Sequence, residues 1–343
     1  PPHIVEAAVK ALRDGYTHYT PAAGLPEVRQ GISAHISRSR NAEVTPAQVV
    51  ITPGAKPIMF FTILALLQPG DEAIYPDPGF PIYRSMIDFV GAVPVPLPLR
   101  EANQFRVDPN EFRSLVNDRT RLIIINTPQN PTGGVLTRAD LEVIANTARE
   151  RNIMVLSDEV YEQILYEGNH TSFISLPGMR SKTVLLDGFS KTYAMTGWRL
   201  GYGVMPEPLA AQIEKLMINS NSCTAAFTQL AGLAALTGPK EAITKMVTSF
   251  RQRRQVIVAG LNEIPGFRCA EPAGAFYAFA NVSGTGLESK TVETLLLNKA
   301  GVATLDGGGF GQFGTGYIRF SYANSTANIR TALSRIHRLV ETW

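Results

Sequence analysis

The sequence predicts an α/β fold in which helices cover both faces of a mostly parallel sheet, joined to a smaller α+β domain. From about residue 47, short apolar runs alternate with helical stretches. Several of these runs are apolar almost throughout, which is typical of strands buried on both faces. After about residue 245 the alternation stops, and a basic helix leads into a β-rich segment. We therefore expect a three-layer α/β/α large domain and a second, smaller domain.

The large domain is expected to span residues 45–245, because the alternating pattern fills this range. Within it, the helix predicted at Arg138–Arg149 places Leu141, Ile144 and Ala148 on one side, as a helix packed on a sheet requires. The predicted strands are all short and apolar, and they are Val49–Ile51, Ala73–Tyr75, Val93–Leu97, Leu122–Ile125, Ile153–Leu156, Thr183–Leu186 and Gly201–Val204.

The smaller domain is expected to combine residues 1–44 with residues 246–343. The N-terminal part predicts two short helices, and in the second one Val28, Ile32 and Ile36 form a single apolar stripe. The C-terminal part predicts helices and strands around a Gly-rich segment, in the order helix Lys245–Leu261, β-rich segment Phe267–Val282, Gly-rich segment Asp306–Gly316, strand Tyr317–Tyr322 and a helix from Thr326.

The composition argues against several classes of protein. Lys and Arg total 32 and Asp and Glu total 29, so the net charge of +3 does not indicate a nucleic-acid surface. Cys223 and Cys269 lie far apart, and the five histidines show no paired spacing, so we expect neither a disulfide framework nor a metal site. No run reaches the ~18 apolar residues of a membrane span, and no signal peptide opens the chain. We therefore expect a cytoplasmic protein that does not enter a membrane.

Polar residues that follow the predicted strands are the first candidates for a site, because ligands of open α/β sheets bind at the carboxyl ends of the strands. Lys191 follows the strand Thr183–Leu186 and can act as a nucleophile if burial or a nearby cation, such as Arg199, lowers its pKa. Asp158 follows the strand Ile153–Leu156, so it should be partly buried and should need a partner, for which a protonated pyridine nitrogen would serve. The competing interpretations are a surface lysine in a turn, and a helix N-cap or a structural ion pair for the aspartate.

Two turns after predicted strands offer hydrogen-bond donors. In Asn126–Gly134, the residues before each proline disfavour helix, so a rigid extended turn would hold Asn130 as a fixed donor. The segment Ile51–Pro57 links a strand to an apolar helix whose free N–H groups could receive a phosphate, and Gly54 would let the anion approach closely. Both segments are also compatible with ordinary turns.

Two further residues suit a flat, anionic ligand. Phe80 lies in a Pro-rich loop after a strand and could stack on a flat ring, although most such aromatic residues only pack. Arg319 lies between apolar neighbours and could bind a carboxylate with both arms of its guanidinium. Strand alternation alone would make Arg319 a solvent-facing residue.

Taken together and in this order, the motifs resemble those of the fold-type I, class I and II aminotransferases, which use pyridoxal 5'-phosphate (PLP). The motifs are Asn130-Pro-Thr-Gly, Ser157-Asp158-Glu-Val-Tyr161, Ser190-Lys191 with Arg199, and Arg319. The stretch from Ser190 to Gly201 is similar to the prokaryotic aspartate-aminotransferase-like branch, and the likeness covers essentially the whole chain. The resemblance implies a transaminase that moves an amino group between an L-amino acid and a 2-oxo acid by a ping-pong route through the pyridoxal and pyridoxamine forms of PLP.

The resemblance also implies catalytic roles for three matching residues, Lys191, Asp158 and Tyr161. Lys191 would form the internal aldimine and later move the substrate proton. Asp158 would pair with the pyridine nitrogen, while Tyr161 and Asn130 would hydrogen-bond the ring's 3-oxygen. Phe80 would stack on the cofactor ring.

The remaining implied roles concern the phosphate, the substrate and the partner subunit. Arg319 would clamp the substrate α-carboxylate, with Gly24, Phe80 and Asn130 nearby. Tyr19 is similar to the residue that such enzymes donate to the phosphate of the neighbouring subunit, which implies a homodimer with shared active sites. The phosphate would be held by side-chain and backbone donors of Gly54, Ala55, Lys56, Ser190 and Arg199.

The chain departs from the family pattern at two places. Many relatives carry a phosphate-binding serine three residues before the lysine, where this chain has Gly188, so the phosphate site would depend more on Arg199 and on backbone donors. The extended Gly-containing segment that precedes the first helix in relatives is absent from this sequence.

Two other functions use the same cofactor site. A PLP-dependent lyase that eliminates across a carbon–sulfur bond would need the same Lys191, Asp158 and Arg319. A non-catalytic PLP-binding regulatory domain is the other alternative, and the chain shows no evident helix-turn-helix segment to accompany it.

Overall fold

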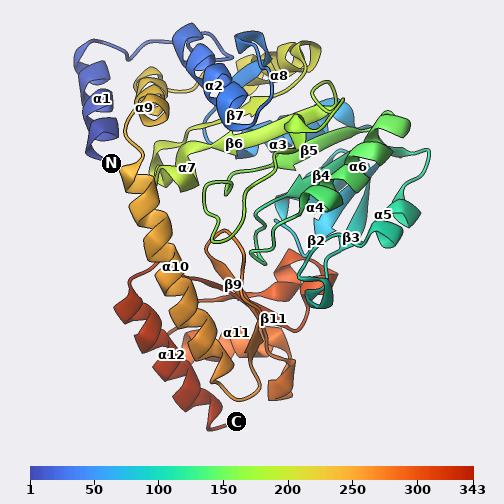
Figure 1. Cartoon of the computed structure of the whole chain (residues 1–343), viewed down its shortest axis with the longest axis vertical. Helices are drawn as coiled ribbons and strands as arrows, with labels where there is room; N and C mark the ends of the chain where they lie inside the picture. The colour runs from blue at the N-terminus through green and yellow to red at the C-terminus, as the bar shows by residue number, and fades with distance from the viewer.

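The computed structural model describes residues 1–343, and the chain builds two sheets, each with its own helices (Figure 1). The larger sheet has seven strands in the order β1-β7-β6-β5-β4-β2-β3. Only β7 runs against its neighbours, and the pairs from β3 to β6 are parallel. The strands are β1 (Val49–Thr52), β2 (Glu72–Asp77), β3 (Val93–Pro98), β4 (Thr120–Asn126), β5 (Met154–Asp158), β6 (Thr183–Gly188) and β7 (Gly201–Val204). All seven predicted strands are present, with ends within two residues of the expected ones.

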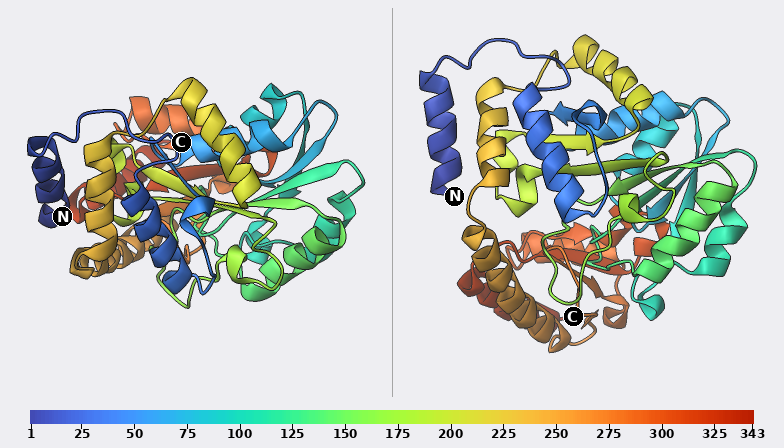
Figure 2. Two further views of the ribbon diagram at one scale, coloured as in Figure 1. Left: turned by 90° about the horizontal axis from the view of Figure 1, so that it is seen from above. Right: turned by 45° about the horizontal axis from the view of Figure 1, so that its top comes forward.

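Helices cover both faces of this sheet, as the three-layer prediction requires (Figure 2). On one face, Ile58, Tyr83 and Ile213 from three helices pack against apolar strand residues. The other face is covered by α1, α2 and α9 at one end and by α5 and α6 at the other. The helices of this part are α1 (Pro2–Arg13), α2 (Pro26–Ser39), α3 (Lys56–Leu66), α4 (Ile82–Phe89), α5 (Pro109–Leu115), α6 (Arg138–Glu150), α7 (Phe189–Thr192), α8 (Glu207–Ser220) and α9 (Ala226–Thr237).

The smaller sheet is antiparallel, in the order β10-β11-β9-β8, and packs against three helices. Its elements are α10 (Glu241–Asn262), β8 (Arg268–Cys269), β9 (Tyr277–Asn281), α11 (Ser289–Asn298), β10 (Leu305–Asp306), β11 (Tyr317–Ser321) and α12 (Thr326–Val340). Short 3-10 turns complete the chain at η1 (Pro46–Gln48), η2 (Glu101–Asn103), η3 (Phe173–Ser175), η4 (Thr196–Trp198), η5 (Ser283–Thr285), η6 (Gly307–Phe310) and η7 (Gln312–Gly314). No helix combines the length and the apolar character that a membrane crossing needs.

The N-terminal helices pack differently from the prediction. Residues 1–44 were expected to complete the smaller domain, but Ile4 of α1 and Ile32 of α2 are buried in one cluster with Ala231 of α9, against the larger sheet. The physical reason is the short connection from α2 to β1, since β1 is an edge strand of that sheet and keeps α2 beside it.

A buried cluster of charges ties α2 to the carboxyl ends of β5 and β6. Arg40, directly after α2, lies 3.2 Å from Glu159, 3.0 Å from Glu162 and 2.9 Å from Asp187. All four side chains are buried. One guanidinium therefore holds together two strand ends that also carry the predicted site carboxylate and the predicted site lysine.

We expect Arg40→Met to lower the free energy of unfolding by about 3–5 kcal/mol, because the change leaves the buried carboxylates of Glu162 and Asp187 without an ion-pair partner and Glu159 with His170 alone. Urea denaturation near neutral pH would measure the loss. The matched control is Arg38→Met, whose side chain is exposed on the same helix. Equal stabilities of the two variants would contradict a structural role for the cluster.

Candidate active site

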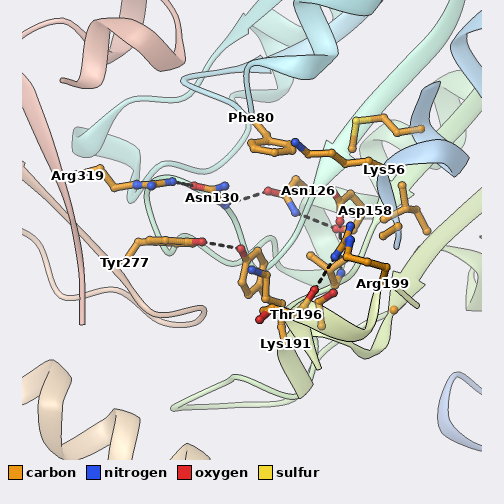
Figure 3. A pocket seen from close by; sticks show the side chains of 17 residues that line it. Lys56, Phe80, Asn126, Asn130, Asp158, Lys191, Thr196, Arg199, Tyr277 and Arg319 are labelled. Atoms are coloured by element: carbon orange, nitrogen blue, oxygen red, sulfur yellow. Dashed lines mark hydrogen bonds between the residues drawn. The ribbon is translucent and has the colours of Figure 1, made fainter. Parts of the chain in front are cut away.

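A cavity of about 340 Å³ lies between the two sheets, at the carboxyl ends of β2, β4, β5 and β6 (Figure 3). Most of its wall comes from the larger sheet and its loops, while Tyr277 of β9 and Arg319 of β11 close it from the smaller sheet. The structure brings ten of the predicted site residues into this one cavity, namely Ala55, Lys56, Phe80, Asn130, Asp158, Tyr161, Ser190, Lys191, Arg199 and Arg319.

Asp158 presents a buried carboxylate that no cation of the protein neutralises. The Tyr83 hydroxyl donates a hydrogen bond to Asp158 Oδ2 at 2.8 Å, and the Val160 amide donates to Oδ1 at 3.3 Å. Burial raises the pKa of Asp158 to about 6, even though both hydrogen bonds lower it. A positively charged ligand group would pair with this carboxylate and keep it ionised.

Lys191 carries an amine that forms no hydrogen bond and lies among aromatic rings. Its Nζ is 5.9 Å from the ring centroid of Tyr161 and 5.5 Å from that of Phe276. Burial lowers the pKa of Lys191, and the positive charges of Arg319 and Arg199 lower it further. An amine with a lowered pKa is more often neutral, and the neutral form is the nucleophile.

Arg319 is the opposite case, a half-buried cation that forms no ion pair with a carboxylate of the protein. Its Nη1 donates to Asn130 Oδ1 at 2.8 Å, and its guanidinium lies 4.5 Å from the Tyr277 ring centroid and 4.8 Å from the Phe310 centroid. Its Nε is buried without a hydrogen-bond partner, and burial lowers its pKa. Such a guanidinium is suited to binding a carboxylate.

The opposite end of the cavity has the features of an anion site. Helix α3 begins here without a side-chain cap, so its N-terminal amides are available to a ligand. Arg199 donates to the Thr196 carbonyl at 2.7 Å, and its guanidinium passes over Gly54, where a Cβ would lie only 2.1 Å from Nη2. At Gly188 a Cβ would lie 3.2 Å from the Gly201 Cα, so the backbone leaves little room for the serine of many relatives.

The sequence matches the family described as aminotransferase class I and II over residues 1–336. The chain belongs to this family. It is 40% identical over 344 residues to an aspartate aminotransferase of Pyrococcus horikoshii, covering 99% of this chain and 88% of the relative. It is 37% identical to aromatic-amino-acid aminotransferase 2 of Thermococcus litoralis, with coverage of 99% and 88%. Its structure is similar to that of an aspartate aminotransferase from Thermus thermophilus with maleate, with a TM-score of 0.94, 35% identity and coverage of 99% and 88%.

The protein is therefore a fold-type I aminotransferase, and the predicted transaminase function is confirmed. The family and its aspartate aminotransferase members imply PLP as the cofactor. The lyase alternative is not favoured, because these relatives bear the names of transaminases. No group of His, Cys, Asp and Glu side chains in this aminotransferase is placed to hold a metal ion.

Three predicted residues do not line the cavity of this aminotransferase. Gly54 lies behind Arg199, against its guanidinium. Tyr19 is in the connection between α1 and α2, and the residue is 88% exposed. Gly24 is buried against Ile51, where a Cβ would lie 2.5 Å from the side chain, and it is not among the residues that line the cavity.

Asn126 braces the site and was not predicted. Its Oδ1 accepts the Asn130 amide at 2.9 Å, and its Nδ2 donates to the Asp158 carbonyl at 3.0 Å (Figure 3). The position was visible in the sequence, because Asn126 opens the same turn that supplies Asn130.

Two tyrosines were also missed. Tyr83 contacts Asp158 and lies three residues after Phe80, at the start of α4, so its nearness to Phe80 in the sequence could have indicated it. The hydroxyl of Tyr277 lies 2.7 Å from that of Tyr161, although the two residues are far apart in sequence. Only the packing of the two sheets reveals this second contact.

The raised pKa of Asp158 gives the cofactor-free enzyme a pH-dependent stability. The folded chain binds this proton more tightly than the unfolded chain, so stability is full below the ordinary pKa of 3.8 and is lost as the pH rises through about 6. A shift of about two pKa units corresponds to about 3 kcal/mol.

We expect Asp158→Asn to remove this loss. Urea denaturation of the cofactor-free wild type and variant, at pH values below and above the shifted pKa, would compare their unfolding free energies. The variant should gain about 3 kcal/mol relative to the wild type between the two conditions. A constant difference across the range would contradict the raised pKa.

Proposed function

We propose that the cavity binds PLP together with an L-amino acid, with Asp158, Lys191 and Arg319 in the principal roles. The observation that carries the proposal is a pair of charged groups without ion-pair partners that face the cavity holding the lysine amine: the buried carboxylate of Asp158 and the half-buried guanidinium of Arg319, whose Nε is buried. A buried charge is stable only with an opposite charge beside it. A cofactor with a cationic ring nitrogen and a substrate with an α-carboxylate would supply both.

The other lining residues fit the rest of the cofactor. Phe80 would stack on the ring, and the side chains of Tyr161 and Asn130 would bind its 3-oxygen. The groups that would hold the phosphate are Arg199, Ser190 and the backbone amides of Ala55 and Lys56 at the start of α3, while Gly54 leaves room for the Arg199 guanidinium beside them. When bound, PLP withdraws electrons from the substrate carbon through its cationic ring.

The residues of the chain then have distinct tasks. Lys191 would hold the cofactor covalently and, once the substrate amine has displaced it, would take and return the substrate proton at Nζ. The lowered pKa of Lys191 favours the neutral form that accepts this proton. The rings of Tyr161 and Phe276 would keep water away from the amine. Arg319 would hold the α-carboxylate of the substrate, so that the substrate proton stays within reach of the Lys191 amine.

We propose a homodimer as the working form. Tyr19 is 88% exposed and does not line the cavity of its own chain, so its hydroxyl is available to the phosphate of a neighbouring copy. We also propose a cytoplasmic location, since Cys223 and Cys269 are free thiols of the kind that a reducing compartment maintains. Residues 45–245 would form the cofactor-binding domain and residues 246–343 the smaller one.

We propose an acidic amino acid as the preferred donor. Lys56 adds a cation to the cavity, with its Nζ 5.2 Å from the Phe80 ring centroid, and it forms no ion pair within the chain. Several relatives are named aspartate aminotransferases, and one of them was solved with the dicarboxylate maleate. The side-chain carboxylate of aspartate or glutamate would pair with Lys56.

We expect Lys191→Ala to lose the covalent attachment of the cofactor. Borohydride reduction should fix PLP on the wild-type chain and leave the variant unlabelled, as read by the mass of the intact protein. The control is Lys182→Ala, because Lys182 is a half-buried lysine that does not line the cavity. Labelling of the Lys191 variant would show that another amine carries the cofactor.

We expect Lys56→Met to raise the KM for L-aspartate by about 10–100-fold, the range that a lost charged hydrogen bond gives. The KM for L-alanine, which has no second carboxylate, should change little. Steady-state kinetics with 2-oxoglutarate as acceptor would measure both values. Equal changes for the two donors would mean that Lys56 does not recognise the side chain.

A further inference from the structure

The Gly-rich segment of the smaller domain is fixed to the larger sheet by one carboxylate. Asp77 ends β2, and its Oδ2 accepts the Gln312 amide at 3.2 Å while its Oδ1 accepts the Phe313 amide at 3.1 Å. Next to it, the Gly79 amide donates to the Phe310 carbonyl at 2.8 Å. Three hydrogen bonds therefore cross between the two parts of the chain at this point.

The Asp77 carboxylate is buried, and the backbone of the Gly-rich segment packs directly against it. Asp77 is 1% exposed and forms no ion pair, so these amides are its main compensation. Gly311 has a φ of +129°, and a Cβ there would lie 2.1 Å from Asp77 Oδ1. Any side chain at residue 311 would displace either the loop or the carboxylate.

The same loop reaches the guanidinium proposed to bind substrate. Phe310 immediately precedes Gly311, is itself buried, and lies 4.8 Å from the guanidinium carbon of Arg319. The Tyr277 ring, 4.5 Å away, also packs on the guanidinium. Aromatic packing on a guanidinium restricts its orientation, and a carboxylate is bound well only when the two planes are aligned.

We propose that Asp77 is a positioning residue for substrate recognition: by holding the Gln312 and Phe313 amides, it keeps Phe310 against Arg319 and so orients the guanidinium for the α-carboxylate. This inference rests on the proposed role of Arg319. Asp77 does not touch the cavity itself, since it is not among the lining residues, and it acts through the loop.

The test compares holoenzyme variants by steady-state kinetics and by maleate inhibition. Asp77→Ala and Gly311→Ala should each raise the KM for L-aspartate and the inhibition constant of maleate about tenfold, because small displacements of a binding group weaken recognition. The kcat at saturating substrate and the affinity for PLP should stay close to the wild-type values. Asp88→Asn, an exposed carboxylate on the neighbouring helix α4, is the matched control and should change none of these quantities.

A third variant, Phe310→Leu, removes the ring and leaves the loop anchor in place. It should reproduce the rise in KM and in the inhibition constant even if Asp77→Ala folds poorly. Wild-type KM values in the Phe310 variant would overturn the inference. A loss of PLP affinity and of kcat in step with KM in the Asp77 and Gly311 variants would also overturn it, since a merely structural role predicts that result.

Arg319→Lys separates this inference from the proposed function. If it leaves the KM for L-aspartate unchanged, the assignment of the α-carboxylate to Arg319 fails and the inference fails with it. If Arg319→Lys raises KM but the Asp77, Gly311 and Phe310 variants do not, the proposed function stands and only the positioning role is lost.

Discussion

Two charged groups without ion-pair partners, the buried carboxylate of Asp158 and the half-buried guanidinium of Arg319, are the constraint on which the rest of this aminotransferase depends. Desolvating such groups costs several kcal/mol per ion unless an opposite charge arrives, so the fold carries a cost that ligands offset. The remaining structure keeps both charges in place. Asn126 braces the turn below Asp158, and the rings of Phe310 and Tyr277 pack on the guanidinium of Arg319.

The cluster around Arg40 lies outside the cavity, and there the buried charges form ion pairs with one another. Three carboxylates surround one guanidinium. Arg40 thereby links the ends of β5 and β6, which lie next to Asp158 and Lys191. The two arrangements lie near the same edge of the sheet. In the first arrangement the carboxylates pair with a guanidinium of the protein itself, whereas in the second Asp158 and Arg319 form no ion pair within the chain.

Much of the fold and of the site followed from the sequence. Strands buried on both faces leave apolar runs, and Lys191, Asp158 and Asn130 lie where those runs end, so both could be located without coordinates. The packing of α1 and α2 could not, because an apolar stripe records that a helix is buried but not which surface buries it. Tyr277 and Asp77 were missed for a related reason: each makes its contact with a segment distant in the chain, and no local pattern encodes such a contact.

The division of the site between two sheets has a consequence for selectivity. The lysine amine belongs to the larger part and the arginine proposed to bind the substrate carboxylate to the smaller one, so the distance between them would select ligands by the separation of their amine and carboxylate. An alkylamine without a carboxylate would leave the guanidinium desolvated and alone, and an ω-amino acid would place its carboxylate at the wrong distance. Both would be rejected by an electrostatic penalty rather than by lack of room.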